Sequence, residues 1–314
     1  MVAGDVVQAE RLLREILDNN HQNYAALLGL ACLNMKLGRL QTARKFIQQA
    51  LKYYPDAYKL YELQGYSYAV ESDLLASAAA YQKALKLYPD CVSIQHLLNG
   101  VQQKTTATAP IDYIRDLFDD YAEVFERDLL IALNYRSFAD LAALITEVIS
   151  PRSSIDSVLD LGCGTGLLGQ ALKDQFQIRH LVGVDLASNM LVKSRARNIY
   201  NTLYNAELLQ HLQNSNDLYD VIGATDVLTY IGDLAATFAE SYKSLNPGGF
   251  LGFTVESLDS GSFKLMPTGR YKHALSYLAA LSSRSGFSKI WTKPIDLRKE
   301  YGNIVAGYLV LLQK

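Results

Sequence analysis

Ser157-Val158-Leu159-Asp160-Leu161 runs directly into Gly162-Cys163-Gly164-Thr165-Gly166. The apolar stretch predicts a β-strand. The alternate glycines let the backbone turn at positive φ, and because they lack a Cβ they let a ligand approach the main chain. The helix expected from about Leu167 to Lys173 then points its first N–H groups at that ligand. The pattern predicts a nucleotide-type cofactor site, with a glycine turn that binds no ligand as the alternative.

Two kinds of cofactor use such a turn, because Gly164 to Gly169 also fits the dinucleotide fingerprint G-x-G-x-x-G. Asp160 distinguishes them by its charge. A neighbouring carboxylate repels a pyrophosphate by as much as about 4 kcal/mol at a separation of about 4 Å and an effective dielectric constant near 20. S-adenosylmethionine instead carries an ammonium and a sulfonium, which a carboxylate attracts. We therefore expect S-adenosylmethionine rather than a dinucleotide.

A second acid follows in the expected order. Leu181 to Asp185 predicts a strand that ends in a carboxylate about 20 residues past the glycines, where it can accept both ribose hydroxyls. Asp185 would otherwise cap the next helix, but Ser188 is expected to supply that cap. Leu203 to Glu207 predicts a short third strand that places Glu207 or the Leu208 amide near the adenine, unless Glu207 is simply a solvated surface residue.

The rest of the C-terminal half alternates strands and helices, which is typical of a doubly wound α/β sheet of about seven strands. Asn246-Pro247-Gly248-Gly249 is expected to end a helix and begin a strand. The expected strands are Tyr219–Ala224, Phe250–Val255, 287–293 and 304–312, and the expected helices are 233–245 and 271–283.

These motifs resemble the class I, Rossmann-like S-adenosylmethionine-dependent methyltransferases across roughly residues 155 to 314. The resemblance rests on Val158 to Gly166, Gly183-Val184-Asp185 and Leu245 to Gly249. It implies a seven-stranded sheet of order 3-2-1-4-5-7-6 with the last strand antiparallel. The cofactor contacts expected together with Asp160 and Asp185 are Tyr121, Gly162, Cys163, Gly164, Gly166, Leu186, Met190, Ala206, Glu207, Leu208, Ala224, Thr225 and Asp226.

The first hundred residues repeat with a period of 34, the spacing of Pro55 and Pro89. They resemble tetratricopeptide repeats, with one repeat at 24–54 and one at 57–88. Residues 4–20 are expected to be the second helix of a truncated unit, and 91–103 a closing helix. The many tyrosines suit binding of a peptide or protein. In the alternative interpretation those at core positions, such as Tyr61, Tyr68 and Tyr81, only fill the helix interfaces.

A polar, proline-ended stretch from Lys104 to Pro110 predicts a linker. Amphipathic helices are expected at 111–126 and 138–149. The sequences of residues 112–122, 133–136 and 267–273 resemble predicted methyltransferases that carry tetratricopeptide repeats. This resemblance implies that the two helices form a lid over the cofactor, with Tyr113 and Tyr121 as lid candidates. Ordinary helix packing is the alternative. The expected domains are 1–104 (repeats), 105–150 (linker and lid) and 151–314 (methyltransferase core).

Methyl transfer is displacement in line, so catalysis consists mainly of holding acceptor, carbon and sulfur collinear. Arg270, Tyr271 and His273 follow the fifth expected strand on the side where ligands bind in open α/β sheets. Arg270 is expected to bind an acceptor carboxylate or phosphate, and His273 to take a proton near neutral pH. In the alternative interpretation, Arg270 and His273 stabilise the adjoining helix.

Composition narrows the acceptor. The formal charge of −2 and the lack of a basic run make nucleic acid an unlikely partner. The turn Ala224-Thr225-Asp226-Val227 also lacks the Asn-Pro-Pro-Tyr pattern of amino methylation of DNA bases. We expect a small-molecule or protein acceptor, with a protein or peptide partner on the repeats. A cofactor-binding scaffold without turnover, an NAD-dependent oxidoreductase and a nucleic-acid methyltransferase are the alternatives.

Apolar runs, the pattern at the start of the sequence and the cysteines bear on the cellular compartment. The sequence contains no apolar run of about 20 residues and no basic-then-apolar start, so we expect no membrane span and no secretion. Cys32, Cys91 and Cys163 are scattered and odd in number, which favours reduced thiols, a cytoplasmic location and no metal site.

Overall fold

The computed structural model describes residues 3–123, 125–127, 135–301 and 303–314. Its chain forms two compact units. The first comprises Met1–Thr106 with the short segments Leu265–Gly269 and Glu300–Asn303, and the second comprises Ala107–Lys264, Arg270–Lys299 and Ile304–Lys314. Each unit has its own hydrophobic core.

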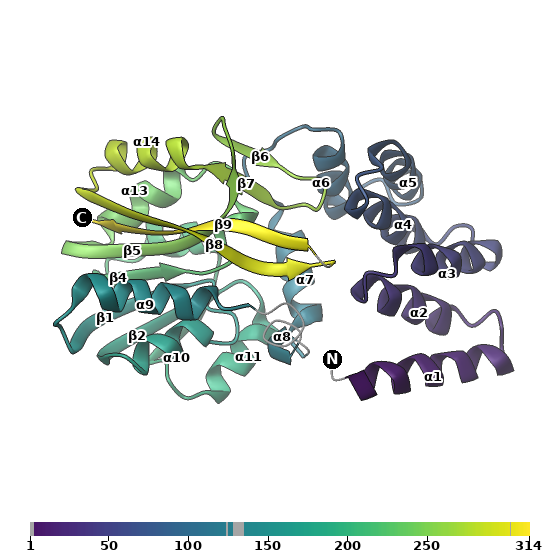
Figure 1. The fold of residues 1–314 in the computed structure, drawn as a ribbon, viewed down its shortest axis with the longest axis horizontal. Coiled ribbons are helices and arrows are strands. Elements are labelled where there is room, and N and C mark those ends of the chain that lie inside the picture. Colours follow the sequence, from purple (N-terminus) through teal and green to yellow (C-terminus); the bar gives the residue numbers. More distant parts are fainter. Residues whose placement is uncertain (1–2, 124, 128–134, 302) are drawn as a thin grey trace. The chain divides into compact units, whose positions relative to one another are not determined.

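The first unit is helical and built from antiparallel hairpins (Figure 1). Its helices are α1 (Ala3–Asn19), α2 (Tyr24–Lys36), α3 (Leu40–Tyr53), α4 (Tyr58–Val70), α5 (Leu74–Leu87) and α6 (Val92–Val101). Asn23 and Asp73 cap α2 and α5 by accepting hydrogen bonds from the N–H groups of Ala26 and Ala76. A Cβ at Gly65 would lie 2.7 Å from the Tyr81 ring, so glycine permits the close approach of α4 and α5. The predicted repeat at 24–54 corresponds to the pair α2 and α3, and the predicted repeat at 57–88 to the pair α4 and α5.

The tyrosines of the first unit fall into two groups. Tyr61 and Tyr81 are buried between helices, where they fill the interfaces. Others pair within each repeat: the Tyr24 and Tyr54 rings lie 5.0 Å apart, as do the Tyr58 and Tyr88 rings one repeat later. The 34-residue period is therefore visible in the aromatic contacts themselves.

The second unit is built on a mixed sheet. Strands β1 (Ser154–Leu161), β2 (Gln177–Asp185), β3 (Thr202–Asn205), β4 (Tyr219–Ala224) and β5 (Leu245–Leu258) are parallel in the order β3-β2-β1-β4-β5. Strand β9 (Asn303–Gln313) runs antiparallel beside β5, and β8 (Lys289–Glu300) pairs with β9. When these seven strands are numbered among themselves in chain order, β8 is the sixth and β9 the seventh. The order is then 3-2-1-4-5-7-6 with the seventh strand antiparallel, which confirms the expectation.

Two further strands were not expected. Tyr271–Ala274 forms β7 rather than the start of a helix, and it pairs with β6 (Phe263–Leu265) and with residues 256–258 of β5. Strand β9 covers only residues 250–256 of β5, so the end of β5 has an open edge that β7 fills. The helix begins later, as α14 (Leu275–Ser285). Asn246 to Gly249 lies within β5 as a bulge, because Leu245 pairs with Tyr219 and Phe250 with Val221.

Helices cover both faces of the sheet (Figure 1). Val158 of β1 packs with α9 (Ser137–Ile149) and α10 (Leu167–Lys173), whereas its neighbour Leu159 packs on the opposite face with α12 (Leu208–Asn214), α13 (Ala235–Lys243) and α14. Every residue of β1 from Ser157 to Leu161 is buried, as expected for a parallel strand that is covered by helices on both faces. The remaining helices are α7 (Ile111–Tyr121), α8 (Phe125–Arg127), α11 (Ser188–Ala196) and the 3₁₀ turn η2 (Leu228–Tyr230). Among the described residues, no helix combines the length and apolarity needed to span a bilayer.

Candidate functional site

The glycine turn after β1 has one open position. Gly162, Gly164 and Gly166 all have positive φ, at +62°, +53° and +91°. A Cβ at Gly162 would lie 2.2 Å from Val227, so this glycine lets the turn after β4 pack closely. A Cβ at Gly164 would meet nothing nearer than the Phe125 ring at 3.9 Å. Gly164 is therefore where the backbone is open to a ligand.

Asp160 lies beneath this turn and is almost completely buried, with 1% of its surface exposed. Its Oδ2 accepts hydrogen bonds from the Tyr200 hydroxyl at 2.6 Å and from the Gly169 N–H at 3.1 Å. Burial raises the pKa of Asp160 to about 7, and the charge of Asp185 adds to the rise, while the two hydrogen bonds oppose it. One N–H in the first turn of α10 therefore bonds to the protein itself rather than pointing at a ligand.

Asp185 ends β2 and holds the turn from the other side. Its Oδ2 accepts from the Gly164 N–H at 2.7 Å, and its Oδ1 from the Ala187 N–H at 2.8 Å. The expected cap from Ser188 is absent, because α11 begins one residue after Ala187 and has no side-chain cap. Burial raises the pKa of Asp185 to about 6. Each carboxylate oxygen has two lone pairs, so Asp185 retains capacity for ligand hydroxyls.

The other expected cofactor contacts lie around these two acids at the carboxyl ends of β1 to β4. Met190 and Ala224 are buried, whereas Leu186, Ala206, Leu208 and Thr225 are partly exposed. Glu207 caps α12, since its Oε2 accepts from the Gln210 N–H at 2.7 Å. Cys163 is buried in the turn, and desolvation raises the pKa of its thiol well above the usual range. This thiol therefore has little nucleophilic character.

Residues of α7, of α8 and between them are tied to α11 and to its C-cap Arg197. The ties are Asp119 Oδ1 to the Asn189 N–H (2.8 Å), Glu123 to Lys193 (2.8 Å) and Glu126 to Arg197 (2.6 Å). Arg197 Nε also donates to the Thr165 carbonyl at 2.5 Å, which links this α7–α8 segment to the glycine turn.

Aromatic rings of the same segment cluster around Phe125, which lies beside the turn. Phe125, the residue nearest the open side of Gly164, contacts the Tyr121 ring edge to face at 5.5 Å and the Phe118 ring at 6.2 Å. Tyr113 lies about two turns earlier on α7 and is partly buried. Tyr121 was predicted as a lid residue and Phe125 was not, although both belong to the amphipathic pattern of residues 111–126. Of the other residues quoted for the lid resemblance, Leu133 and Asn134 lie outside the described residues.

A buried ion cluster at the ends of β4 and β5 was not anticipated. Arg298 on β8, 3% exposed, contacts Asp226 Oδ1 at 2.8 Å and also Glu256 Oε1, and Glu256 is itself 4% exposed. Asp226 has a positive φ of +60°, and its N–H donates to Thr254 Oγ1 at 2.9 Å. The carboxylate expected to contact the cofactor is therefore paired with a cation 72 residues away in the chain.

Of the three expected catalytic residues, two lie in the interior. Tyr271 and His273 on β7 are fully buried, and His273 Nε2 lies 3.0 Å from the Gly232 carbonyl. A carbonyl only accepts hydrogen bonds, so Nε2 donates and the ring serves to hold this loop. Burial lowers the pKa of His273 to about 4, which makes it a weak base. Arg270 is partly exposed, and its Nε donates to the Tyr230 hydroxyl at 3.4 Å.

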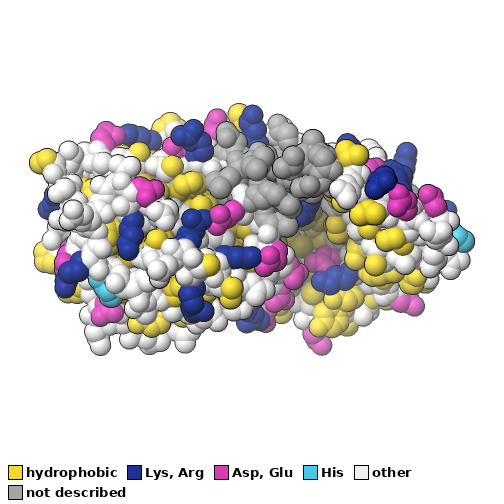
Figure 2. Space-filling model, turned by 90° about the horizontal axis from the view of Figure 1, so that it is seen from below, with side chains coloured by type: hydrophobic (Ala, Val, Ile, Leu, Met, Phe, Trp, Pro, Cys, Tyr) yellow, Lys and Arg dark blue, Asp and Glu magenta, His cyan; other side chains and the backbone are white. Residues whose placement is uncertain are grey.

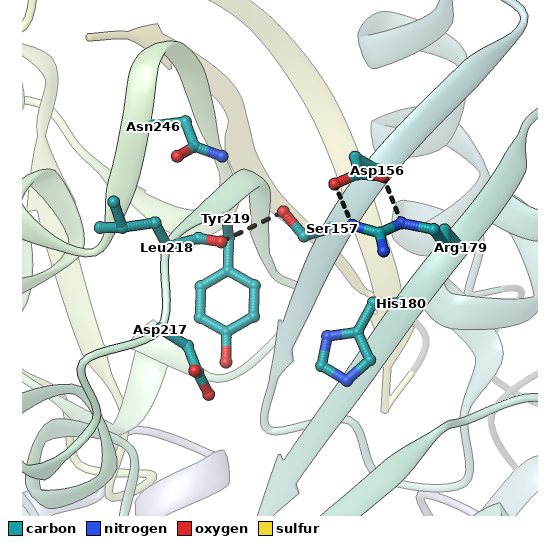
Figure 3. Close-up of a pocket in the computed structure, with 8 residues that line it drawn as sticks. All are labelled: Asp156, Ser157, Arg179, His180, Asp217, Leu218, Tyr219 and Asn246. Atoms are coloured by element: carbon teal, nitrogen blue, oxygen red, sulfur yellow. Dashed lines mark hydrogen bonds and ion pairs between the residues drawn. The ribbon is translucent and has the colours of Figure 1, made fainter.

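A separate cavity of about 330 Å³ lies at the amino ends of β1, β2 and β4 (Figure 3). Asp156 and Arg179 pair across its rim at 2.5 Å, and the Ser157 hydroxyl donates to the Leu218 carbonyl at 3.2 Å. The glycine turn and both site acids lie at the carboxyl ends of the strands, so this cavity is at the opposite edge of the sheet. It does not belong to the site built around Gly164.

The surface charge is mixed. Figure 2 shows Lys and Arg side chains dispersed among acidic and apolar ones on the face in view. Within the described part of the chain, no group of three or more His, Cys, Asp or Glu side chains is arranged to hold a metal ion.

Comparison with known proteins agrees with this architecture. Residues 159–251 match the family described as a methyltransferase domain, and residues 2–63 match the tetratricopeptide repeat family. Malonyl-[acyl-carrier protein] O-methyltransferase of Bacillus anthracis is 28% identical over 132 residues, which cover 40% of this chain and 49% of that protein. Trans-aconitate 2-methyltransferase of Deinococcus radiodurans is 30% identical over 128 residues, 40% of this chain and 46% of that protein. The chain thus spans about half the length of these two relatives.

Other relatives are covered more fully. Demethylmenaquinone methyltransferase of Leptospira interrogans is 26% identical over 239 residues, 67% of this chain and 94% of that protein. Among solved structures, magnesium protoporphyrin IX methyltransferase of Synechocystis PCC 6803 with bound S-adenosylhomocysteine superposes with a TM-score of 0.50 at 15% identity, over 65% of this chain and 99% of that one. At this identity the likeness concerns the fold.

Proposed function

Because the chain carries a class I methyltransferase domain with a tetratricopeptide region before it, we propose that it transfers a methyl group from S-adenosylmethionine to a small-molecule or protein acceptor. The observation that carries the proposal is the open side of Gly164, flanked by two acids. Its φ of +53° and the free space beside it allow close approach of a ligand. Asp160 and Asp185 supply negative charge and hydrogen-bond acceptors at the ends of adjacent strands.

The residues present fit this cofactor, which when bound supplies a methyl group on a sulfonium centre. Asp160 favours a cation at the turn because its buried charge has few competing water contacts. Asp185 is proposed to accept ribose hydroxyls, which the hydrogen bonds from the Gly164 and Ala187 amides support because they fix the orientation of its carboxylate. Phe125, which the Phe118 ring contacts at 6.2 Å, supplies an apolar ring beside Gly164 that limits the access of water.

On the acceptor side we propose Arg270 as the contact residue. It is the one member of the expected catalytic set that is neither fully buried nor part of the sheet interior. The relatives include enzymes named for malonyl-[acyl-carrier protein] and trans-aconitate, and a guanidinium suits carboxylates of this kind. The chemistry then depends on orientation of the acceptor, with no need for His273 as a base.

The remaining expectations are also proposals. We assign residues 1–104 to the repeats, 105–150 to the linker and lid, and 151–314 to the methyltransferase core, in a cytoplasmic protein. The repeats are proposed to dock a protein partner or a protein-borne acceptor, because rows of paired tyrosines offer apolar area with polar tips.

The test is incubation of the pure protein with radiolabelled S-adenosylmethionine and fractionated lysate, followed by separation of protein, lipid and small-molecule fractions. Label above the level given by the Asp185→Asn variant supports the proposal and names the acceptor class. Cofactor binding without label in any fraction would favour a scaffold without turnover. Tight binding of NADH with no binding of S-adenosylmethionine would refute the proposal.

A further inference from the structure

Three glycines of the cofactor region open onto one aromatic ring. A Cβ at Gly169 would lie 2.5 Å from the Tyr200 hydroxyl, one at Gly183 would lie 2.9 Å from Tyr200 Cε1, and one at Gly166 would lie 3.1 Å from Tyr200 Cε2. Real Cβ atoms essentially never lie under 3.0 Å from such a neighbour, as they would at Gly169 and Gly183, and the 3.1 Å distance at Gly166 is tighter than most real contacts. Gly166 and Gly169 of the glycine pattern, together with Gly183 on β2, therefore line a slot that holds the ring of Tyr200, which lies between α11 and β3 in the chain. Leu203 at 2.7 Å from the Gly183 Cβ position and Arg197 at 3.0 Å from that of Gly166 also limit these two positions.

The hydroxyl at the end of this slot reaches the buried acid. Tyr200 donates to Asp160 Oδ2 at 2.6 Å, beside the Gly169 N–H at 3.1 Å on the same oxygen. A hydrogen bond of this length to a carboxylate is among the stronger kinds in proteins. Burial and the charge of Asp160 raise the pKa of Tyr200 well above its usual range, so the hydroxyl keeps its proton and remains a donor.

Other groups around Asp160 do not replace this donor. Asp185 on β2 raises the pKa of Asp160 by its charge, and the Cys163 thiol in the turn is held protonated by burial. Tyr135, which precedes α9, also interacts with Asp160, and burial raises the pKa of its hydroxyl. Asp226, beyond β4, is paired with Arg298. On the α11 side, the Arg197 guanidinium is bonded to the Thr165 carbonyl and to Glu126.

We propose that Tyr200 is a positioning residue of the cofactor site: its ring fixes the glycine turn against β2, and its hydroxyl orients the Asp160 carboxylate and favours its charged form. This inference rests on the proposed cofactor function. It assigns to Tyr200 a contribution to cofactor affinity that acts through the glycine turn and, for the hydroxyl, through Asp160. It also explains why Gly169 and Gly183 are glycines although neither has a positive φ.

The test is Tyr200→Phe, which keeps the ring and removes only the hydroxyl, with Tyr204→Phe on the exposed surface of β3 as the matched control. The dissociation constant of S-adenosylmethionine is measured by calorimetry from pH 6 to 9. Loss of a hydrogen bond to a charged group is expected to move the midpoint of the pH profile upward by about one pH unit, which weakens binding about fivefold at pH 7. The variant and the wild type should converge near pH 9, and the control should match the wild type throughout.

A second measurement uses no ligand, so it separates this inference from the proposed function. Because Tyr200 favours the charged form of Asp160, the melting temperature of Tyr200→Phe should fall further below the wild type as pH rises from 6 to 9, by about 3 to 5 °C. A difference that is constant with pH, in melting or in affinity, would show a purely structural role and overturn the inference. Failure of the wild type to bind S-adenosylmethionine would refute the proposed function, and the melting profiles would still decide the role of Tyr200.

Discussion

Gly164→Ala tests whether the open side of the glycine turn is a ligand cradle. The φ of +53° opposes any L side chain, which costs about 1 to 2 kcal/mol of folding free energy. The new methyl group meets nothing in the protein nearer than Phe125 at 3.9 Å, so no clash adds to this cost. It does occupy the space where a ligand would approach the main chain, and overpacking of that kind costs about 1 to 3 kcal/mol. The dissociation constant of S-adenosylmethionine should therefore rise about 5- to 150-fold.

The matched control is Gly248→Ala. Gly248 has a similar φ of +75° and no atom within 4 Å of a built Cβ, and it lies in the bulge of β5 before the parallel pairing resumes. Both variants should lose a similar few degrees in melting temperature, measured by calorimetry. Only Gly164→Ala should lose cofactor affinity. If the dissociation constant of Gly164→Ala stays within about twofold of the wild type while its melting temperature falls like that of Gly248→Ala, the cofactor does not bind against Gly164 and the reasoning is refuted.

Three further outcomes are expected. Since the pKa of Asp160 is raised to about 7, its ionised fraction rises from about one tenth at pH 6 to about nine tenths at pH 8, and the affinity for the cationic cofactor should rise about tenfold over this range. Titration calorimetry of Asp160→Asn should show a flatter dependence of affinity on pH. Arg298→Met leaves Glu256 buried without its cation, so the free energy of unfolding measured with denaturant should fall by about 3 to 5 kcal/mol, and the double variant with Glu256→Leu should regain part of it. An unchanged free energy of unfolding in the single variant would contradict the ion cluster. His273→Gln keeps a donor for the Gly232 carbonyl, so the pH dependence of kcat/KM should persist, and a loss of more than about 100-fold in a folded variant would restore His273 as the base.

Local sequence was enough to predict the parts whose geometry is set by neighbouring residues. The strand into Gly162, the acid that ends β2 at Asp185, and the repeat period between Pro55 and Pro89 all follow from backbone conformation and short-range periodicity. The sheet order 3-2-1-4-5-7-6 differs from the order of the strands in the chain, and it was predicted only through the resemblance to class I methyltransferases that these motifs carry.

Partners distant in the chain were not predictable in this way. Tyr271 to Ala274 became a strand because the end of β5 has an edge that β9 leaves open, which no local pattern records. Asp226 gained Arg298 from 72 residues away, and the hydroxyl of Tyr200 reached Asp160 across 40 residues. Local backbone preferences thus determined where the cofactor turn and its acids lie, whereas tertiary packing decided which groups surround those acids. The charge of a buried carboxyl depends on its partners in space, and only the folded chain brings them together.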